Sequence, residues 1–456
     1  MTYEEYFKNL CGKKINVIGA GVSNTPLIKM LVKYGALVTV CDKKENLGTL
    51  GDELLSLGVK LNLGLGYLDN LDGEIIFRSP GIRPDIPEFL KAKENGALIT
   101  SEMEVFFDLC PCKIIAVTGS DGKTTTTTLI SEFLKEAGYK VHIGGNIGKP
   151  LLPEIADIKD TDMVVLELSS FQLFTIRKSP HIAVITNLEP NHLNWHKNYK
   201  EYIDAKKNIM LHQGENDILV TNAANPDSIP VEKEAKGISR TFSRKIDCMC
   251  CLKGEKITYK GEEILDMNDI VLPGLHNVEN YMTAICATYD LVSKDVIRKV
   301  ATTFEGVKHR IEFVREVGGV KFYNDSIASS PSRAIAGLNS FDKKIIMIAG
   351  GLDKKVPYDV LGPIICEKVK TLVLLGNGAP DAAAPQIKKA VENAKEFENS
   401  GIEIKETSTL KDAVMAAKES AKDGDIVILC PAATSFDMFT NFEERGNKFK
   451  DLVNEL

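Results

Sequence analysis

Short apolar runs alternate with amphipathic stretches along most of the chain. The first series joins an apolar run at 15–21 to a helical pattern and then to the run LVTVCD at 37–42. Two later series repeat this order, with predicted strands at 113–119, 163–170, 181–188, 344–351, 371–378 and 425–432. Strands that alternate with helices form parallel sheets covered by helices. The pattern therefore predicts an α/β protein.

One stretch breaks this alternation. Residues 240–272 contain short runs separated by turn signals, which predicts small antiparallel strands. The chain has 456 residues, and at roughly 150 residues per domain this length suggests about three domains. We expect the domains at 1–105, 106–307 and 308–456.

Composition and charge narrow the class of protein. The formal net charge of -7 argues against a nucleic-acid partner, because a phosphate backbone attracts a basic surface. No apolar run approaches the ~20 residues that a membrane span requires. The first residues, MTYEEYFKNLCGKK, lack the basic and then apolar order of a signal peptide. We therefore expect a cytoplasmic protein without a membrane span.

The ten cysteines agree with a reducing compartment. Several lie inside apolar, strand-like runs, as Cys41 and Cys430 do. The clusters Cys110–Cys112 and Cys248–Cys251 raise the alternative of a zinc site, but neither has paired CxxC spacing. We interpret them as incidental thiols.

A glycine-rich turn follows the apolar run at 113–118. It reads GSDGKTT over 119–125, the ending of a phosphate-binding loop, although Val117 stands where the full pattern has glycine. Backbone N–H groups at such a helix N-terminus bind anions. Lys123 can reach terminal phosphates, and Thr124 stands where a magnesium ligand is expected. A plain strand-to-helix turn is the alternative, and we favour nucleotide binding.

Further polar residues follow the next predicted strands. Glu167 closes a buried strand, where a charge needs a partner or a metal ion. His192 is a candidate metal ligand or general base, although a histidine in a loop is usually neither. Lys206, from its local sequence alone, is a solvated helix lysine.

Further polar residues lie at the ends of predicted elements. Arg310 stands at a predicted domain junction, where a guanidinium can clamp a phosphate. Asp325 follows a strand-like run, and Asn280 opens a helix. The stretch GAGVSN at 19–24, with Asp42 after the next strand, is similar to a dinucleotide fingerprint without its third glycine.

Together these motifs resemble the Mur ligase superfamily. The motifs are TGSDGKTT, LELSSFQL, GLHNVEN, KHR, YNDS and CPAATSFDMFTNFEERG, in this order over nearly the whole chain. The resemblance implies three domains: a Rossmann-like UDP-sugar-binding domain at 1–105, a central P-loop-type ATPase domain at 106–307, and a Rossmann-like amino-acid-binding domain at 308–456. The central domain is expected to hold a parallel sheet plus a small antiparallel sheet.

The stretches GAGVSN, SPGI, GGNIG and SFDMFTNFEERG narrow the resemblance within the family. They imply ATP-dependent ligation of D-glutamate to UDP-N-acetylmuramoyl-L-alanine through an acyl phosphate, in cytoplasmic peptidoglycan precursor synthesis. The implied cofactors are ATP and two Mg²⁺ ions, and we expect a monomer.

The resemblance also assigns residues. The catalytic residues that it implies are Lys123, Glu167, His192 and Lys206. The residues expected to bind ATP are Gly119, Ser120, Asp121, Gly122, Lys123, Thr124, Thr125, Asn280, Arg310 and Asp325. Those for the UDP-sugar are Val22, Ser23, Asp42, Lys43, Ser79, Gly81, Asn146, Ser169 and Gln172. Those for D-glutamate are Ser329, Lys354, Ser435 and Phe442. The implied metal ligands are Thr124, Glu167, His192 and a carbamylated Lys206.

Four alternatives stay open. Two are a related ligase that adds another amino acid and a folate-type polyglutamate ligase. The others are a dinucleotide-dependent oxidoreductase that uses the GAG turn and a non-catalytic nucleotide-binding module. One departure concerns the D-glutamate site, because Ile327 stands where many members of the family have a lysine.

Overall fold

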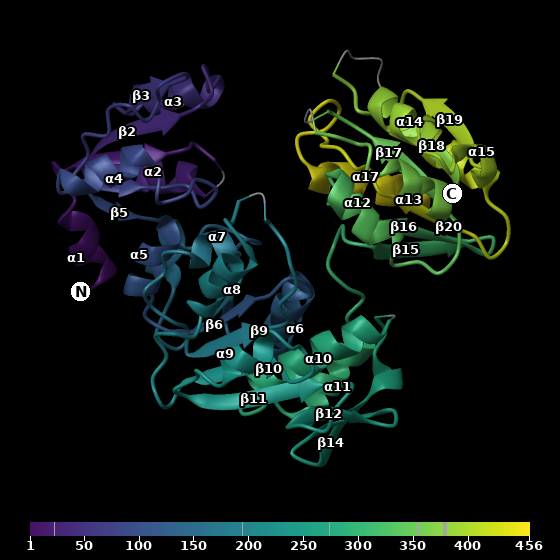
Figure 1. The fold of residues 1–456 in the computed structure, drawn as a ribbon, viewed down its shortest axis with the longest axis horizontal. Helices are drawn as coiled ribbons and strands as arrows, with labels where there is room; N and C mark the ends of the chain where they lie inside the picture. Colours follow the sequence, from purple (N-terminus) through teal and green to yellow (C-terminus); the bar gives the residue numbers. More distant parts are fainter. Residues whose placement is uncertain (22, 194, 273, 354–355, 377–380) are drawn as a thin grey trace. The chain divides into compact units, whose positions relative to one another are not determined.

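The computed structural model of the chain forms two compact units, Met1–Phe304 and Glu305–Leu456. It describes residues 1–21, 23–193, 195–272, 274–353, 356–376 and 381–456. The first unit contains a five-stranded and a nine-stranded sheet, and the second contains a six-stranded sheet (Figure 1). These three sheets, which are mainly parallel and covered by helices, confirm the predicted α/β class. The predicted division at 105/106 falls inside helix α5 and stays a prediction.

The N-terminal sheet is wholly parallel, in the order β3-β2-β1-β4-β5. Its central strand β1 is buried after its first residue, as expected for a strand covered on both faces. The strands are β1 (Lys14–Ile18), β2 (Leu37–Asp42), β3 (Lys60–Leu63), β4 (Ile75–Phe77) and β5 (Leu98–Thr100). The helices are α1 (Tyr3–Lys8), α2 (Asn24–Lys33), α3 (Thr49–Ser56), α4 (Pro87–Glu94) and α5 (Glu102–Leu109).

The nine-stranded sheet has the order β14-β13-β12-β11-β10-β9-β6-β8-β7. The strands are β6 (Lys113–Thr118), β7 (Val141–Gly145), β8 (Met163–Glu167), β9 (Ile182–Ile185), β10 (Ile218–Asn222), β11 (Ile238–Ser243), β12 (Cys250–Lys253), β13 (Lys256–Tyr259) and β14 (Glu262–Asp266). The antiparallel part predicted within 240–272 is β12–β14, and it continues the parallel strands. Strand β11, which begins that stretch, pairs in parallel with both its neighbours.

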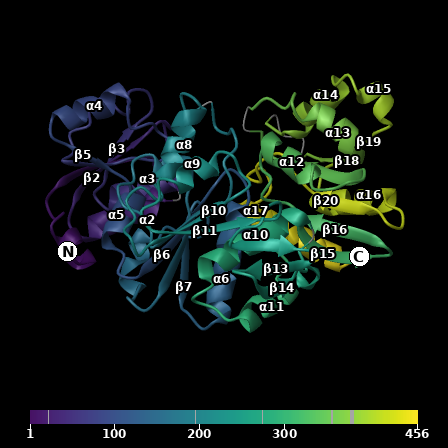
Figure 2. The same ribbon diagram turned by 60° about the horizontal axis from the view of Figure 1, so that its bottom comes forward.

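Helices α6 (Lys123–Glu136) and α10 (Leu275–Thr288) pack together on one face of this sheet (Figure 2). Their buried side chains, among them Phe133 and Tyr281, share a core with Val117 and Val165 of the strands. The remaining helices of this part are α7 (Ser170–Leu173), α8 (Tyr199–Lys207), α9 (Ser228–Glu232), α11 (Lys294–Thr303), and the 3-10 helices η1 (Leu152–Asp157) and η2 (Met267–Asp269).

The sheet of the second unit has the order β15-β16-β20-β17-β18-β19, and only β15 and β16 pair antiparallel. Helices α12, α13 and α14 contribute to the core on one face, and α16 and α17 to the core on the other. The strands are β15 (Glu312–Val317), β16 (Val320–Asn324), β17 (Ile345–Gly350), β18 (Val369–Leu375), β19 (Glu403–Thr407) and β20 (Ile426–Leu429). The helices are α12 (Pro331–Leu338), α13 (Gly362–Lys368), α14 (Ala384–Glu392), α15 (Phe397–Ser400), α16 (Leu410–Ser420) and α17 (Phe442–Asn454).

Within the described ranges, no helix combines the length and the apolar character that crossing a bilayer requires.

Candidate active site

The candidate site begins where three neighbouring parallel strands end. Strand β6 lies between β9 and β8, so their carboxyl ends share one edge of the sheet. Val117 pairs with Glu167, and Thr118 pairs with Ile185. The loop after β6, the carboxylate at the end of β8 and the segment after β9 are therefore brought together. Ligands bind at this edge in open α/β sheets.

The phosphate loop has the backbone that its glycines permit. Gly122 has φ 75° and is the N-cap residue of helix α6, which begins at Lys123. A Cβ on Gly122 would lie 2.5 Å from the Asn280 amide oxygen, so this position accepts only glycine without movement. With glycine as the N-cap, the first N–H groups of α6 are not capped by its side chain. That geometry suits a phosphate.

The segment after β9 holds this loop in place. The Asn187 amide oxygen accepts hydrogen bonds from the backbone N–H groups of Ser120 (3.1 Å) and Asp121 (2.9 Å). The Ser120 hydroxyl lies 2.9 Å from the Tyr202 hydroxyl and accepts a hydrogen bond from the Glu189 N–H at 2.8 Å. Asn187 is not among the residues that the motifs single out. Its only signal is its place just after a buried strand.

Two lysines approach the loop from different elements. Lys123 donates to the Ser120 carbonyl at 2.9 Å. Lys206, from α8, is 2% exposed and donates to the Gly119 carbonyl at 2.8 Å and the Thr118 hydroxyl at 3.1 Å. Burial, and then the positive charge of Lys123, lower the pKa of Lys206 well below its ordinary value. The interpretation of Lys206 as a solvated helix lysine is therefore wrong.

Glu167 has the surroundings of a cation ligand. Its side chain is 1% exposed, and one carboxylate oxygen accepts a hydrogen bond from the Asn146 amide at 2.8 Å. The other oxygen, Oε2, is buried without a hydrogen-bond partner. An unpaired buried carboxylate oxygen is costly unless a cation binds it, and Mg²⁺ prefers oxygen ligands.

The donor set around this carboxylate is sparse. In the described parts of the chain, no group of three or more His, Cys, Asp or Glu residues is placed to hold a metal ion. Thr124, in the first turn of α6, is 8% exposed and adds a hydroxyl. One carboxylate and one hydroxyl fit Mg²⁺, which keeps several waters and binds substrate phosphates, better than they fit Zn²⁺.

His192 lies in the loop after β9 with φ 54°, a strained value for a residue other than glycine. Its ring contacts Phe171 at a centroid distance of 5.0 Å. Partial burial and the charges of Lys123 and Lys206 lower the pKa of His192. The neutral imidazole is the form that binds metal ions.

The residues expected at a UDP-sugar site lie partly around the edge of the N-terminal sheet. Asp42, at the end of β2, accepts hydrogen bonds from the N–H groups of Ala20 and Lys44, each at 2.9 Å. Lys43, the next residue, is exposed, and so is Ser23, which lies in the turn after β1. Val22 lies outside the described residues.

The other residues expected at that site follow β4, β7 and β8. A Cβ on Gly19 would lie 3.6 Å from the Ser79 Cβ, so the loops after β1 and β4 are neighbours. Gly81 has open space around its Cα. Ser169 and Gln172 form the capping box of α7, so their polar groups already bind each other.

The second unit carries the remaining residues expected at a nucleotide site. Asp325 is 3% exposed, accepts a hydrogen bond from the Ile311 N–H at 3.2 Å, and has its pKa raised to about 7 by burial. Arg310 lies between His309 (φ 64°) and Ile311 (φ 47°). Positive φ at a β-branched residue is strained, and such strain concentrates at functional sites.

The residues expected to bind D-glutamate also belong to this unit. Ser435 is 2% exposed, and Ser329 donates to the Ile327 carbonyl at 3.1 Å. Phe442 begins helix α17, and its carbonyl accepts a hydrogen bond from the Ser326 hydroxyl at 2.7 Å. Lys354 lies outside the described residues.

The edge of the nine-stranded sheet is thus equipped for phosphoryl chemistry. A helix N-terminus without a side-chain cap, together with Lys123, can hold a polyphosphate, and Glu167 with Thr124 can hold its cation. Positive groups around a phosphate stabilise the charge that develops during transfer.

Comparison with known families gives matches to two parts of the chain. The profile of the Mur ligase middle domain matches residues 117–288. The profile of the Mur ligase, glutamate ligase domain matches residues 309–433.

Similar proteins match over nearly their full length. One from Acetivibrio thermocellus is 55% identical, over 99% of this chain and 98% of its own, and one from Ruminiclostridium cellulolyticum is 52% identical over 99% of both. Each is named UDP-N-acetylmuramoylalanine--D-glutamate ligase. Among solved structures, UDP-N-acetylmuramate-alanine ligase MurC from Thermotoga maritima has a TM-score of 0.59 at 19% identity, over 97% of this chain and 99% of that one. MurF from Acinetobacter baumannii has 0.58 at 15% identity, over 98% and 92%.

Proposed function

This chain belongs to the Mur ligase family, and we propose that it uses ATP to join D-glutamate to UDP-N-acetylmuramoyl-L-alanine. The observation that supports this chemistry is that the phosphate loop and Glu167 lie at the same edge of the sheet, and that one Glu167 oxygen has no hydrogen-bond partner. The choice of substrates is supported by relatives of that name at 51–55% identity.

The reaction needs an activated acceptor, since a free carboxylate resists attack by an amine. The L-alanine carboxylate oxygen attacks the terminal phosphorus of ATP, the bond to ADP breaks, and an acyl phosphate forms. The D-glutamate nitrogen then attacks the acyl carbon, loses a proton and expels phosphate, leaving the amide. The N–H groups at the start of α6 and the Lys123 ammonium hold the phosphates in line for the first step.

Two magnesium ions complete the proposed site. Thr124 and Glu167 would hold one ion and His192 the second. The ions would neutralise the phosphate charge that the loop alone leaves uncompensated. The unpaired Oε2 of Glu167 and the neutral imidazole of His192 both fit this role.

Lys206 would serve as a carbamate. An ammonium group at this position would repel the cations, whereas the carbamate, formed when the uncharged amine adds CO₂, supplies oxygen ligands. The burial of Lys206 and its nearness to Lys123 favour the uncharged amine. Protein equilibrated with ¹³C-bicarbonate should give a carbamate resonance that a Lys206→Gln variant lacks, and the same spectrum for both would refute the modification.

The substrate contacts follow the same pattern. Asn280, Arg310 and Asp325 would contact the nucleotide, and the residues around Asp42 and Ser79 the UDP-sugar. Ser435 and Phe442 would contact D-glutamate. We further propose three domains, at 1–105, 106–307 and 308–456, in a cytoplasmic monomer that acts in peptidoglycan precursor synthesis.

An acceptor screen tests this function. With UDP-N-acetylmuramoyl-L-alanine, ATP and Mg²⁺, phosphate release should require D-glutamate. L-lysine, meso-diaminopimelate and L-glutamate should not replace it. Turnover with L-lysine or diaminopimelate equal to that with D-glutamate would indicate another ligase of the family, and turnover with a folate acceptor would indicate a polyglutamate ligase.

A further inference from the structure

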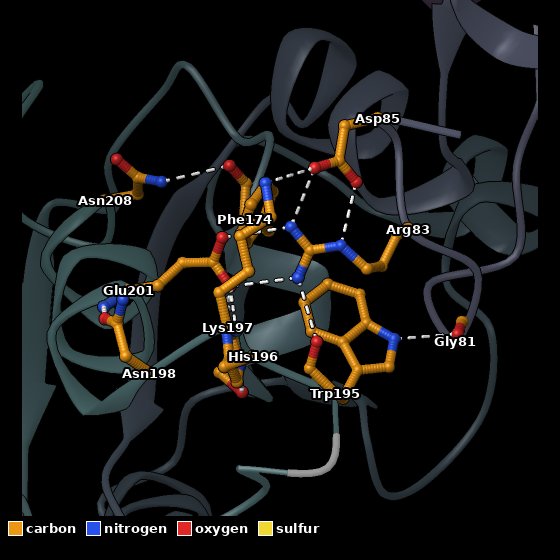
Figure 3. Close-up of polar contacts among 11 residues, drawn as sticks. Gly81, Arg83, Asp85, Phe174, Trp195, His196, Lys197, Asn198, Glu201 and Asn208 are labelled. Atoms are coloured by element: carbon orange, nitrogen blue, oxygen red, sulfur yellow. Dashed lines mark hydrogen bonds and ion pairs between the residues drawn. The ribbon is translucent and has the colours of Figure 1, made fainter. Parts of the chain in front are cut away.

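Arg83 uses its whole guanidinium group in contacts between two distant segments of the first unit. It lies two residues after Gly81 in the loop between β4 and α4. It bonds to Asp85 at 2.8 and 2.9 Å, to Glu201 at 2.9 and 3.0 Å, and to the Trp195 carbonyl at 2.9 Å (Figure 3). These five hydrogen bonds occupy all five N–H donors of the side chain.

Trp195 is held by this loop and by two phenylalanines at helix α7. Its indole N–H donates to the Gly81 carbonyl at 2.8 Å, and the Arg83 guanidinium lies 5.0 Å from its ring centre (Figure 3). The indole also packs against Phe171 and Phe174, at centroid distances of 4.6 and 5.4 Å. The position of Gly81 is therefore tied to the position of Trp195.

Glu201 connects the same arginine to helix α8. It lies in the first turn of α8, and it also accepts a hydrogen bond from the Lys197 N–H at 2.8 Å. The last turn of this helix carries Lys206, whose Nζ donates a hydrogen bond to the carbonyl of Gly119 in the phosphate loop. Arg83 thus bonds to the helix that reaches the phosphate loop.

The contact differs from an ordinary surface ion pair. Arg83 and Glu201 are 19% and 20% exposed, and the pairing is bidentate. The guanidinium lowers the pKa of Glu201 to about 2, so the pair stays charged throughout the physiological range. Exposed pairs contribute little, whereas a bidentate, partly buried arginine fixes a geometry.

We propose that Arg83 is a positioning residue for the ligation. Through Gly81 and Trp195 on one side and Glu201 on the other, it holds the loop that binds the sugar nucleotide at a fixed position relative to the helix that carries Lys206. This relative position determines where the acceptor carboxylate meets the terminal phosphate. The inference rests on the proposed function, in which Gly81 contacts the UDP-sugar.

Kinetics of Arg83→Gln test the inference. We expect KM for UDP-N-acetylmuramoyl-L-alanine to rise about tenfold and kcat to fall by about 10²-fold, because a small displacement of a reacting group is costly. KM for D-glutamate should not change. Arg83→Lys should not restore activity, because one ammonium cannot replace a bidentate fork. Glu201→Gln should match Arg83→Gln, and the double variant should be no worse than either.

Lys178→Gln is the matched control. Lys178 forms an ion pair with Asp108 at 2.8 Å in the same unit, but both side chains are more than half exposed. Its removal should leave both kinetic constants unchanged. If Arg83→Gln lowers the thermal midpoint but keeps wild-type constants below that midpoint, its role is only structural and the inference fails.

The only tryptophan of the chain provides a readout besides turnover. Binding of the sugar nucleotide should change the Trp195 emission of the wild type. In Arg83→Gln the free protein should emit at longer wavelength and respond less. An unchanged emission and response would overturn the inference. If the wild type binds the sugar nucleotide but does not ligate D-glutamate, the proposed function fails, and the emission of the variant still tests the contact.

Discussion

At the scale of single residues, two carboxylates at opposite ends of strand β8 have different tasks. Asp162, just before the strand, is paired with His142 at 2.7 Å, which lowers the pKa of Asp162 to about 2. Glu167, at the other end, leaves one buried oxygen without a partner. The first carboxylate stabilises the fold, and the second is available to bind a cation.

Glu167→Gln should therefore damage catalysis and spare the fold. The amide keeps an oxygen for Asn146 but removes the charge, so we expect kcat to fall by at least about 10²-fold and the Mg²⁺ requirement to rise. The free energy of unfolding should not decrease. Asp162→Asn is the control, and it should cost about 1–3 kcal/mol of stability with kcat retained. An unchanged Mg²⁺ dependence in Glu167→Gln would exclude Glu167 as a ligand.

Glu102 gives a prediction about pH. It is 7% exposed, accepts a hydrogen bond from the Leu152 N–H at 2.9 Å, and burial raises its pKa to about 7. The folded state therefore binds more protons than the unfolded state between about pH 4.5 and 7. The free energy of unfolding of the first unit should fall as pH rises through this window, by roughly 3 kcal/mol at most.

Glu102→Gln keeps the acceptor oxygen and removes this dependence. Denaturation followed by Trp195 fluorescence should find the variant more stable than the wild type at pH 8, and little different at pH 4.5. The exposed Glu94→Gln should change stability equally at both pH values. A Glu102→Gln variant with the same pH profile as the wild type would contradict the assignment.

At the scale of elements, the positions of strands can be predicted from the sequence, but the strands with which they pair cannot. The run at 37–42 matches β2 (Leu37–Asp42), and the run at 113–119 matches β6 (Lys113–Thr118), because a buried parallel strand is a continuous apolar run. Strand β11 was grouped with the antiparallel stretch, since pairing direction depends on a neighbour distant in sequence. The loop contacts of Asn187 were missed for the same reason.

Helix α6 allows a test of its N-terminal turn. Gly122→Ala would add a Cβ 2.5 Å from the Asn280 oxygen, whereas Gly138→Ala, at the other end of the helix, would meet nothing within 4 Å. Both glycines have positive φ, 75° and 93°, so each change should cost about 1–2 kcal/mol of stability. Only Gly122→Ala should also raise KM for ATP, measured by initial rates. Equal KM values for ATP in the two variants would show that the loop does not bind the nucleotide.

At the scale of the whole molecule, the two units have separate hydrophobic cores. Among the described residues, each apolar cluster lies wholly within Met1–Phe304 or wholly within Glu305–Leu456. A unit with its own core can fold alone. The chain divides into these units between Phe304 and Glu305. The expected boundary at 307/308 stays a prediction.

The fragment 305–456 should therefore fold by itself. We expect a far-ultraviolet circular dichroism spectrum of mixed helix and strand and a cooperative thermal transition. A fragment that begins at 345, without β15 and β16, should not fold, because it lacks Val320 and Phe322 from the buried core. A disordered 305–456 fragment would show that its core depends on the first unit.

Local sequence was sufficient to predict the fold class and the family, since apolar periodicity and short motifs depend on residues close together in the chain. Three features needed tertiary structure: the burial of Lys206, the unpaired oxygen of Glu167 and the five hydrogen bonds of Arg83. Each depends on groups that folding brings from distant segments. Burial and pairing, which determine whether a charged side chain is solvated, structural or catalytic, are properties of that packing.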